Sequence, residues 1–190
     1  MKFKGIAAAV LLLAASPAAV AYKVEAITAK DWPSVAGKIA IAPSVCPPDF
    51  DCAWLNEVVA EYFAEHEPPV LSVDSQTVSQ ALLESGTDQL TDANRAQIAE
   101  ALGVQSFFVV VVGNSEVKST GAIATSIGHS VIMTPTTVGT GSLEVRVVSP
   151  DGKLLAKATG FGESGWRSGR RLIGAVFEDV FYRLFPEEEE

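Results

Sequence analysis

Three glycines form the first motif that could do chemistry. Gly160, Gly162 and Gly165 fit the G-x-G-x-x-G pattern, which holds the pyrophosphate of a dinucleotide. That site needs a strand–helix–strand unit. Here a hairpin is predicted before the glycines, no strand follows the next helix, and Glu163 would set a carboxylate beside the phosphates. We therefore interpret the segment as a flexible turn that lets the last helix fold back onto the sheet.

A second motif, Gly128-His129-Ser130, resembles half of a nucleophile elbow. Position 132 is Ile, however, where the second glycine of that motif belongs. His66 follows Glu65 at the end of a predicted helix, where a charged imidazole suits the helix dipole. The chain has two His and two Cys in unrelated contexts, which is too few to support a zinc site. The sequence thus predicts no catalytic residue, no metal site and no cofactor.

The two cysteines, Cys46 and Cys52, are separated by five residues that include Pro47 and Pro48. One interpretation is a redox pair, but redox motifs usually have two intervening residues and a basic neighbour that lowers a thiol pKa. The other interpretation is a structural disulfide, which an exported protein favours. Closing so short a loop would stabilise the fold by roughly 2 to 2.5 kcal/mol.

One dense basic cluster stands out in an otherwise acidic chain. Its members are Trp166, Arg167, Arg170 and Arg171. An indole beside three guanidinium groups could hold an anionic ligand or the carboxylates of a partner. The alternative is an ordinary solvated helix surface. The formal net charge of −9 argues against nucleic-acid binding, because no broad basic face is available to displace counterions.

Residues 1–21 have the pattern of a secretory signal peptide. Lys2 and Lys4 precede an apolar run, and Ala19-Val20-Ala21 is a small-x-small cleavage site. The apolar run is about half of the roughly 20 residues that span a bilayer, which argues against an uncleaved anchor. Tyr22 stands where a bacterial lipoprotein needs a cysteine. We therefore expect a periplasmic or secreted protein, with outer-membrane association as an option, that is not a lipoprotein.

Hydrophobic periodicity predicts a single α/β domain over residues 38–186, between a lead-in segment 22–37 and an acidic tail 187–190. The expected fold is a mixed sheet of about five strands covered by helices. The expected strands are 38–42, 70–73, 107–112, 143–147 and 154–158. The expected helices are 54–63, 74–83, 91–102 and 172–185.

The insertion 119–143 contains no Asp, Glu, Lys or Arg. It is either an extended hairpin that packs against a partner or lipid, or a flexible loop rich in Gly, Ser and Thr. Four apolar residues share one side if the segment is extended: Ile123, Ile127, Val131 and Met133. Pro135 and four glycines argue against a long regular strand, and His129 would sit poorly in hydrocarbon. A partner-facing or oligomer-facing arm is therefore favoured over a membrane-spanning hairpin.

Four segments together resemble a known family. They are Lys38–Pro43, Leu102–Val111, Glu116–Gly121 and Leu143–Leu155. They look like the periplasmic domain of the curli secretion channel and its relatives, the TolB amino-terminal domain and the outer-membrane lipoprotein activators of peptidoglycan synthases. The resemblance implies an anticodon-binding-domain-like fold and a non-enzymatic envelope protein that assembles with envelope proteins or with itself. The chain lacks an acylated cysteine, and residues 160–166 are too few for a second hairpin, so a complete secretion pore is not implied.

Two functions follow as expectations. The first is a binding or assembly module of the cell envelope. The alternative is a soluble periplasmic receptor for a small anionic ligand, held by Trp166 and the arginines. An assembly module should form a defined oligomer or co-purify with an envelope protein, whereas a receptor should be monomeric and be stabilised by its ligand.

Overall fold

The computed structural model describes residues 21–30, 32–66, 68, 70–127, 130–165 and 169–186. The side chains of residues 21, 22, 120–127 and 130–137 are outside that description. The predicted acidic tail and the predicted signal peptide, apart from Ala21, lie outside the described residues.

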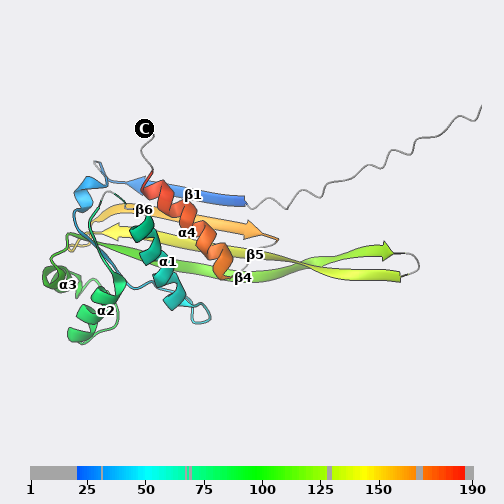
Figure 1. Cartoon of the computed structure of the whole chain (residues 1–190), viewed down its shortest axis with the longest axis horizontal. Coiled ribbons are helices and arrows are strands. Elements are labelled where there is room, and N and C mark those ends of the chain that lie inside the picture. The colour runs from blue at the N-terminus through cyan, green and yellow to red at the C-terminus, as the bar shows by residue number, and fades with distance from the viewer. Residues whose placement is uncertain are drawn as a thin grey trace, which may run out of the picture.

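A six-stranded mixed sheet runs through the described part of the chain (Figure 1). Its strands are β1 (Ala21–Thr28), β2 (Ile39–Ile41), β3 (Ser72–Val73), β4 (Ser106–Ile127), β5 (Ser130–Val148) and β6 (Leu154–Ser164). The order is β1-β6-β5-β4-β2-β3. The first four of these are antiparallel neighbours, whereas β2 is parallel to β3 and to β4. The predicted α/β class with a mixed sheet is confirmed.

The described helices are α1 (Cys52–Glu65), α2 (Ser75–Glu84), α3 (Arg95–Leu102), α4 (Arg170–Leu184) and the short 3-10 helix η1 (Ser34–Ala36). Aspartates begin two of them. The Asp51 carboxylate accepts from Trp54 N at 3.0 Å, and the Asp74 carboxylate accepts from Thr77 N at 2.9 Å. Each bond satisfies an N–H group that the first helical turn leaves without a partner.

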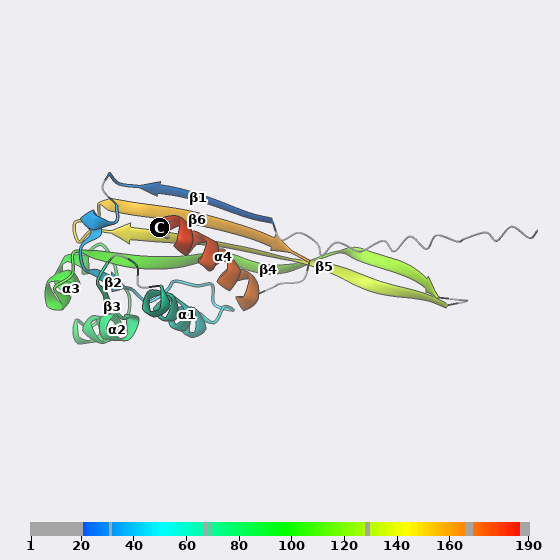
Figure 2. The same ribbon diagram turned by 45° about the horizontal axis from the view of Figure 1, so that its top comes forward.

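The helices cover the two faces of the sheet to different extents (Figure 2). α1 and α4 cover one face, where Phe108, Phe177 and Phe181 are fully buried. α2 and α3 pack on the other face near β2 and the start of β4, where Phe107 and Leu82 are buried. Successive residues of β4 thus enter two different cores, which explains why the start of this strand is apolar without alternation.

Glycines in β5 and β6 let α4 approach the sheet closely. A Cβ atom on Gly160 would lie 2.5 Å from Val176 Cγ1 and 2.7 Å from Val180 Cγ2. Gly160 and Gly162 both belong to β6, and Gly160 lies under α4. This corrects the interpretation of the glycine motif as a flexible turn: the missing side chains make room for packing.

β1 is the largest departure from the predicted fold. The segment 22–37 was expected to be only a lead-in, yet β1 pairs with β6 from Ala21 opposite Glu163 to Thr28 opposite Ala156. This strand raises the sheet from the expected five strands to six. Its apolar and charged residues alternate for only a few positions, too few to separate a strand from a loop in the sequence.

Candidate functional site, a projecting arm

β4 and β5 continue past the rest of the sheet as a two-stranded ribbon (Figure 1). Gly139 is the residue of β5 nearest the end of the ribbon that still pairs with β6. Beyond it, within the described residues, the two strands pair only with each other, up to Ile127 opposite Ser130. We refer to residues 119–127 and 130–138 as the arm.

The pairing of β4 with β5 shows that the uncharged segment is an extended hairpin and not a flexible loop. Pro135 lies opposite Ala122 within regular pairing, and the arm contains a single shift in register, between Ser119 and Gly121. The expectation that proline and glycines would prevent a long regular strand was wrong. Both strands of a ribbon have an outer edge, where the nitrogen of a proline needs no partner.

The register also corrects which residues share a face of the arm. Because Ile127 pairs with Ser130, odd-numbered residues of β4 lie on the same face as even-numbered residues of β5. Ile123 therefore falls on the face opposite to Met133, so the apolar residues do not form the single side that was expected. Both faces combine apolar with small and hydroxyl-bearing residues, and neither carries a charged residue.

A ribbon of two strands makes few contacts of its own that stabilise it in water. An isolated hairpin is marginally stable at best, because it lacks a further layer to bury its faces. The start of α4 packs over Gly141, where Leu172 and Ile173 are its neighbours, and the helices lie over the body of the sheet and not over the arm (Figures 1 and 2). Among the described residues, no helix covers either face of the arm and no third strand pairs with its outer edges.

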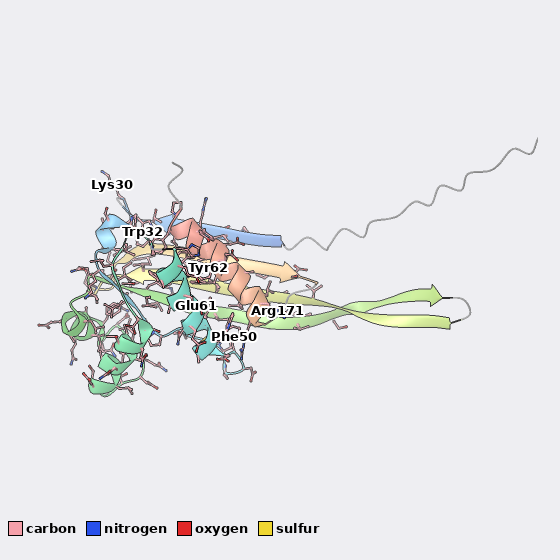
Figure 3. The ribbon with its side chains drawn as sticks, viewed as in Figure 1. Lys30, Trp32, Phe50, Glu61, Tyr62 and Arg171 are labelled. Carbon is pink, nitrogen blue, oxygen red and sulfur yellow. A yellow bond between two sulfur atoms is a disulfide. The ribbon has the colours of Figure 1, made fainter. Side chains whose placement is uncertain are left out.

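A cleft of about 450 Å³ lies at the base of the arm. Its walls are residues 113–116 of β4, the loop that contains Phe50, and the start of α4 at Arg170. Three carboxylates line it: Asp49, Asp51 and Glu116. Figure 3 shows Phe50 and Arg171 at this end of the body. Asp51 is paired with Arg170 and Glu116 with Lys118, so Asp49 is the lining carboxylate that has no ion pair among the described residues.

Arg170 is already engaged by its own chain. Its guanidinium group donates to the carboxylate of Asp51 and lies over the ring of Trp54, 5.9 Å from the ring centroid. Asp51 is thus both the cap of α1 and the counter-ion of α4. This role was not predicted from the sequence, because the two partners lie 119 positions apart and no local pattern links them.

The other members of the predicted basic cluster are less constrained. Arg171 is exposed and forms no ion pair with the described residues. Trp166 and Arg167 lie outside the described residues, so their roles as partner-binding or ligand-binding residues stay predictions.

The Cys46–Cys52 disulfide is present, with Cα atoms 5.8 Å apart. Cys52 is the first residue of α1, so the bridge ties the segment that leaves β2 to the start of this helix. The short loop it closes carries Phe50 and Asp51 to the cleft. The predicted cysteine pairing therefore fixes one wall of the cleft.

Negative charge gathers where α1 meets α4. Burial raises the pKa of Tyr62 to about 12, and the nearby carboxylates of Glu178, Glu65 and Asp179 contribute.

His66 caps the C-terminus of α1, as expected, and its Nε2 lies 3.3 Å from the hydroxyl oxygen of Tyr182. The surroundings of His66 are those of a packed helix end, with aromatic rings on α1 and α4 beside it.

No metal-binding group of three or more His, Cys, Asp or Glu side chains occurs within the described ranges. The helices in those ranges are also too short or too polar to cross a membrane. Gly128 and His129 of the elbow-like motif lie outside the described residues.

No protein-family model matches the chain, and no curated protein does. Its fold is nevertheless found in solved structures. Lipoprotein GNA1162 from Neisseria meningitidis has a TM-score of 0.51 at 17% identity, over 78% of this chain and 97% of that one. PelC from Paraburkholderia phytofirmans, crystallised as a dodecamer, has a TM-score of 0.49 at 14% identity, over 88% and 100%. The C-terminal domain of LpoB from Escherichia coli has a TM-score of 0.45 at 13% identity, over 69% and 85%.

The likeness to GNA1162 shows that this chain has the α/β fold of a known bacterial lipoprotein. The resemblance to the curli secretion channel, to TolB and to the peptidoglycan-synthase activators stays a prediction.

The same finding corrects the expected localisation. A periplasmic or secreted protein that is not a lipoprotein was expected, because Tyr22 stands where a lipid-bearing cysteine would be. The protein that shares the fold is itself a lipoprotein. A fold is set by packing within the domain and does not depend on a residue ahead of it, so the exclusion does not stand.

Proposed function

We propose that this chain is a non-enzymatic protein of the cell envelope that binds a partner, or further copies of itself, through the arm. The observation that carries the proposal is the arm itself, an uncharged ribbon that projects from the body of a chain with a net charge of −9. Charge repulsion opposes close contact between the acidic surfaces of two such chains. The arm offers a surface from which that repulsion is absent.

The backbone of the arm supports the same proposal. Beyond the body, each arm strand has one edge paired with its neighbour and one edge without a partner among the described residues. Unpaired N–H and C=O groups along a strand can add an extended segment of another chain, with backbone bonds for affinity and side chains for specificity. The fold shared with a lipoprotein supports a place in the envelope.

The base of the arm adds a second area of contact. The cleft beside Phe50 brings an exposed edge of β4 together with the disulfide loop. From the basic cluster, Arg171 would contribute a charge that no described carboxylate neutralises. The receptor alternative has weaker support, because Arg170 is neutralised by Asp51 and the carboxylate of the cleft without an ion pair, Asp49, would repel an anion.

Removing the arm tests this proposal. Lys118 pairs with Val138, so residues 119–137 can be replaced by Asn-Gly, the preferred two-residue hairpin turn. We expect the free energy of unfolding to change by less than about 1 kcal/mol, the usual scale for surface loops. Proteins that crosslink to the intact chain in cells, and any self-association that depends on the arm, should be lost.

A matched control is Leu83→Ser on α2, which removes an exposed apolar side chain remote from the arm. It should leave the crosslinked partners unchanged. If the shortened variant retains every partner and its oligomeric state, the arm is not the binding element. Failure of the shortened variant to fold would instead place the arm in the core of the domain.

A further inference from the structure

β1 forms one edge of the sheet, with β6 on one side and no described strand on the other (Figure 2). The strand has eight residues, no proline and no shift in register against β6. Proteins commonly protect an edge with a proline, a bulge or an uncompensated charge. The charge of Lys23 is compensated by Glu25, 2.7 Å away on the same strand. The outer edge of β1 is therefore available for another strand.

One hydrogen bond shows which backbone groups of β1 face outward. Ala29 N–H donates to the carbonyl oxygen of Leu155 at 2.7 Å, and these two residues continue the register of β1 with β6. In antiparallel strands, residues that bond to a given neighbour alternate with residues that face away from it. The odd-numbered residues therefore bond to β6. The N–H and C=O groups of the even-numbered residues point to the free edge: Tyr22, Val24, Ala26 and Thr28.

We propose that this edge pairs with the same edge of a second copy, so that two β1 strands run antiparallel about a two-fold axis at Val24. Such a contact is isologous, the commonest kind in homodimers. Outward-facing residues must lie opposite outward-facing residues, which restricts the axis to a few positions. An axis at Val24 sets Val24 opposite its copy and Tyr22 opposite Ala26.

The charges select this register among its neighbours. An axis at Val24 places each Lys23 directly opposite Glu25 of the other copy, so two ion pairs form. An axis at Lys23 would place Lys23 opposite Lys23 of the other copy. An axis at Glu25 would place Glu25 opposite Glu25 of the other copy. Like charges directly opposite each other destabilise a pair of strands, and opposite charges stabilise it. When two copies of Lys23-Val24-Glu25 run antiparallel, the lysine of each copy thus lies opposite the glutamate of the other.

A cleft beside β1 fits the same axis. Val24, Asp179, Tyr182 and Arg183 line this cleft of about 410 Å³ between β1 and α4. Asp179 forms no ion pair with the described residues, and burial raises its pKa. Because Val24 lies on the axis, the cleft of one copy faces that of the other, and each contributes one carboxylate and one guanidinium group. Arg183 of one copy can then neutralise Asp179 of the other.

The dimer has a consequence for the arm. Antiparallel pairing reverses the direction of every strand, so the two arms would project in opposite directions from one continuous sheet. A dimer with two arms could hold two partners at once. The contact uses no residue of the arm, so it is independent of the function proposed above.

Crosslinking tests the register directly. Full-length Lys23→Cys and Glu25→Cys proteins should form a disulfide-linked dimer when mixed, in clear excess over either protein alone. Lys157→Cys, on the same face of the sheet but one strand inward, is the matched control and should give no such excess with either protein. No excess in the mixture, or a stronger dimer from either protein alone, would overturn the proposed axis.

A second test uses sedimentation to measure dimer formation in charge-exchange variants and in a proline variant. Lys23→Glu should weaken the dimer about tenfold, and the double variant Lys23→Glu with Glu25→Lys should restore it. Ala26→Pro should abolish the dimer, because it removes an N–H group that faces the free edge and not one that bonds to β6. Circular dichroism should show all three variants folded. The arm-shortened variant should still dimerise, and a monomeric wild-type protein at all concentrations would contradict the proposal.

Discussion

β4 and β5 run through both the body and the arm, and the two halves of each strand have different surroundings. In the body, Phe108, Val110 and Val112 of β4 and Leu143, Val145 and Val147 of β5 are buried under α1 and α4. In the arm, the same strands continue with regular pairing but without a helical layer. Backbone pairing alone therefore carries a strand beyond its core. The two strands therefore extend further than the helices that cover them.

The charges differ between the two halves as well. On the exposed face of the body, Glu144 accepts from both Arg146 and Lys157. Burial by itself would raise the pKa of Glu144, but the hydrogen bonds from Lys157 and Arg146 hold this pKa below its usual value. A sheet face that meets water thus carries paired charges in this protein. The arm carries none, which is typical of a surface that meets something other than water.

The largest effect should come from the body. Phe108→Ala removes a fully buried ring that packs 5.0 Å from the ring of Phe63, between centroids. We expect the free energy of unfolding to fall by about 3 to 5 kcal/mol, through lost burial and a cavity. Urea unfolding followed by circular dichroism measures the loss. The arm-shortened variant is the comparison, and an equal loss in both would remove the distinction between body and arm.

A smaller effect should come from the packing of α4 on the sheet. Gly160→Ala would place a methyl group 2.5 Å from Val176 Cγ1, and we expect a loss of about 1 to 3 kcal/mol. Gly141→Ala, nearer the arm, would meet Ile173 Cδ1 at 2.9 Å. The terminal methyl of Ile173 can move by rotation, so this loss should be smaller. Thermal unfolding of the two variants side by side checks the order, and a larger loss at Gly141 would contradict it.

A still smaller effect should come from a helix cap, and it should depend on pH. Asp74→Ala removes the bonds from Thr77 N and Thr77 Oγ1 at the start of α2, which should cost about 1 kcal/mol at neutral pH. Those two bonds lower the pKa of Asp74 below its ordinary 3.8. The stabilisation is therefore present above pH 3.8 and lost as the pH falls through the lowered pKa.

Unfolding curves between pH 7 and the acid limit of folding would check this dependence. The difference between wild type and Asp74→Ala should shrink as the carboxyl group is protonated. A difference that stays constant down to that limit would mean that the Asp74 carboxylate does not cap α2. Losses from single substitutions in the arm should lie below the loss at this cap, since surface positions usually change stability by less than about 0.5 kcal/mol.

Much of the body could be predicted from the sequence because its signals are local. Apolar residues at helical spacing predicted α1 and α4, and the apolar run at 107–112 predicted the first part of β4. The spacing of Cys46 and Cys52 around two prolines predicted their pairing. Each of these depends on residues close together in the chain, where periodicity and loop length act directly.

The sequence by itself therefore determined the α/β class, the helices that cover the sheet, and the absence of charge along residues 119–143. Only the tertiary structure decided that β1 is a full edge strand, that the uncharged segment is a regular ribbon, and that Asp51 neutralises Arg170. The physical reason is the same in all three cases. Strand pairing and ion pairing join residues far apart in the chain, and they depend on how the whole sheet packs rather than on any local pattern.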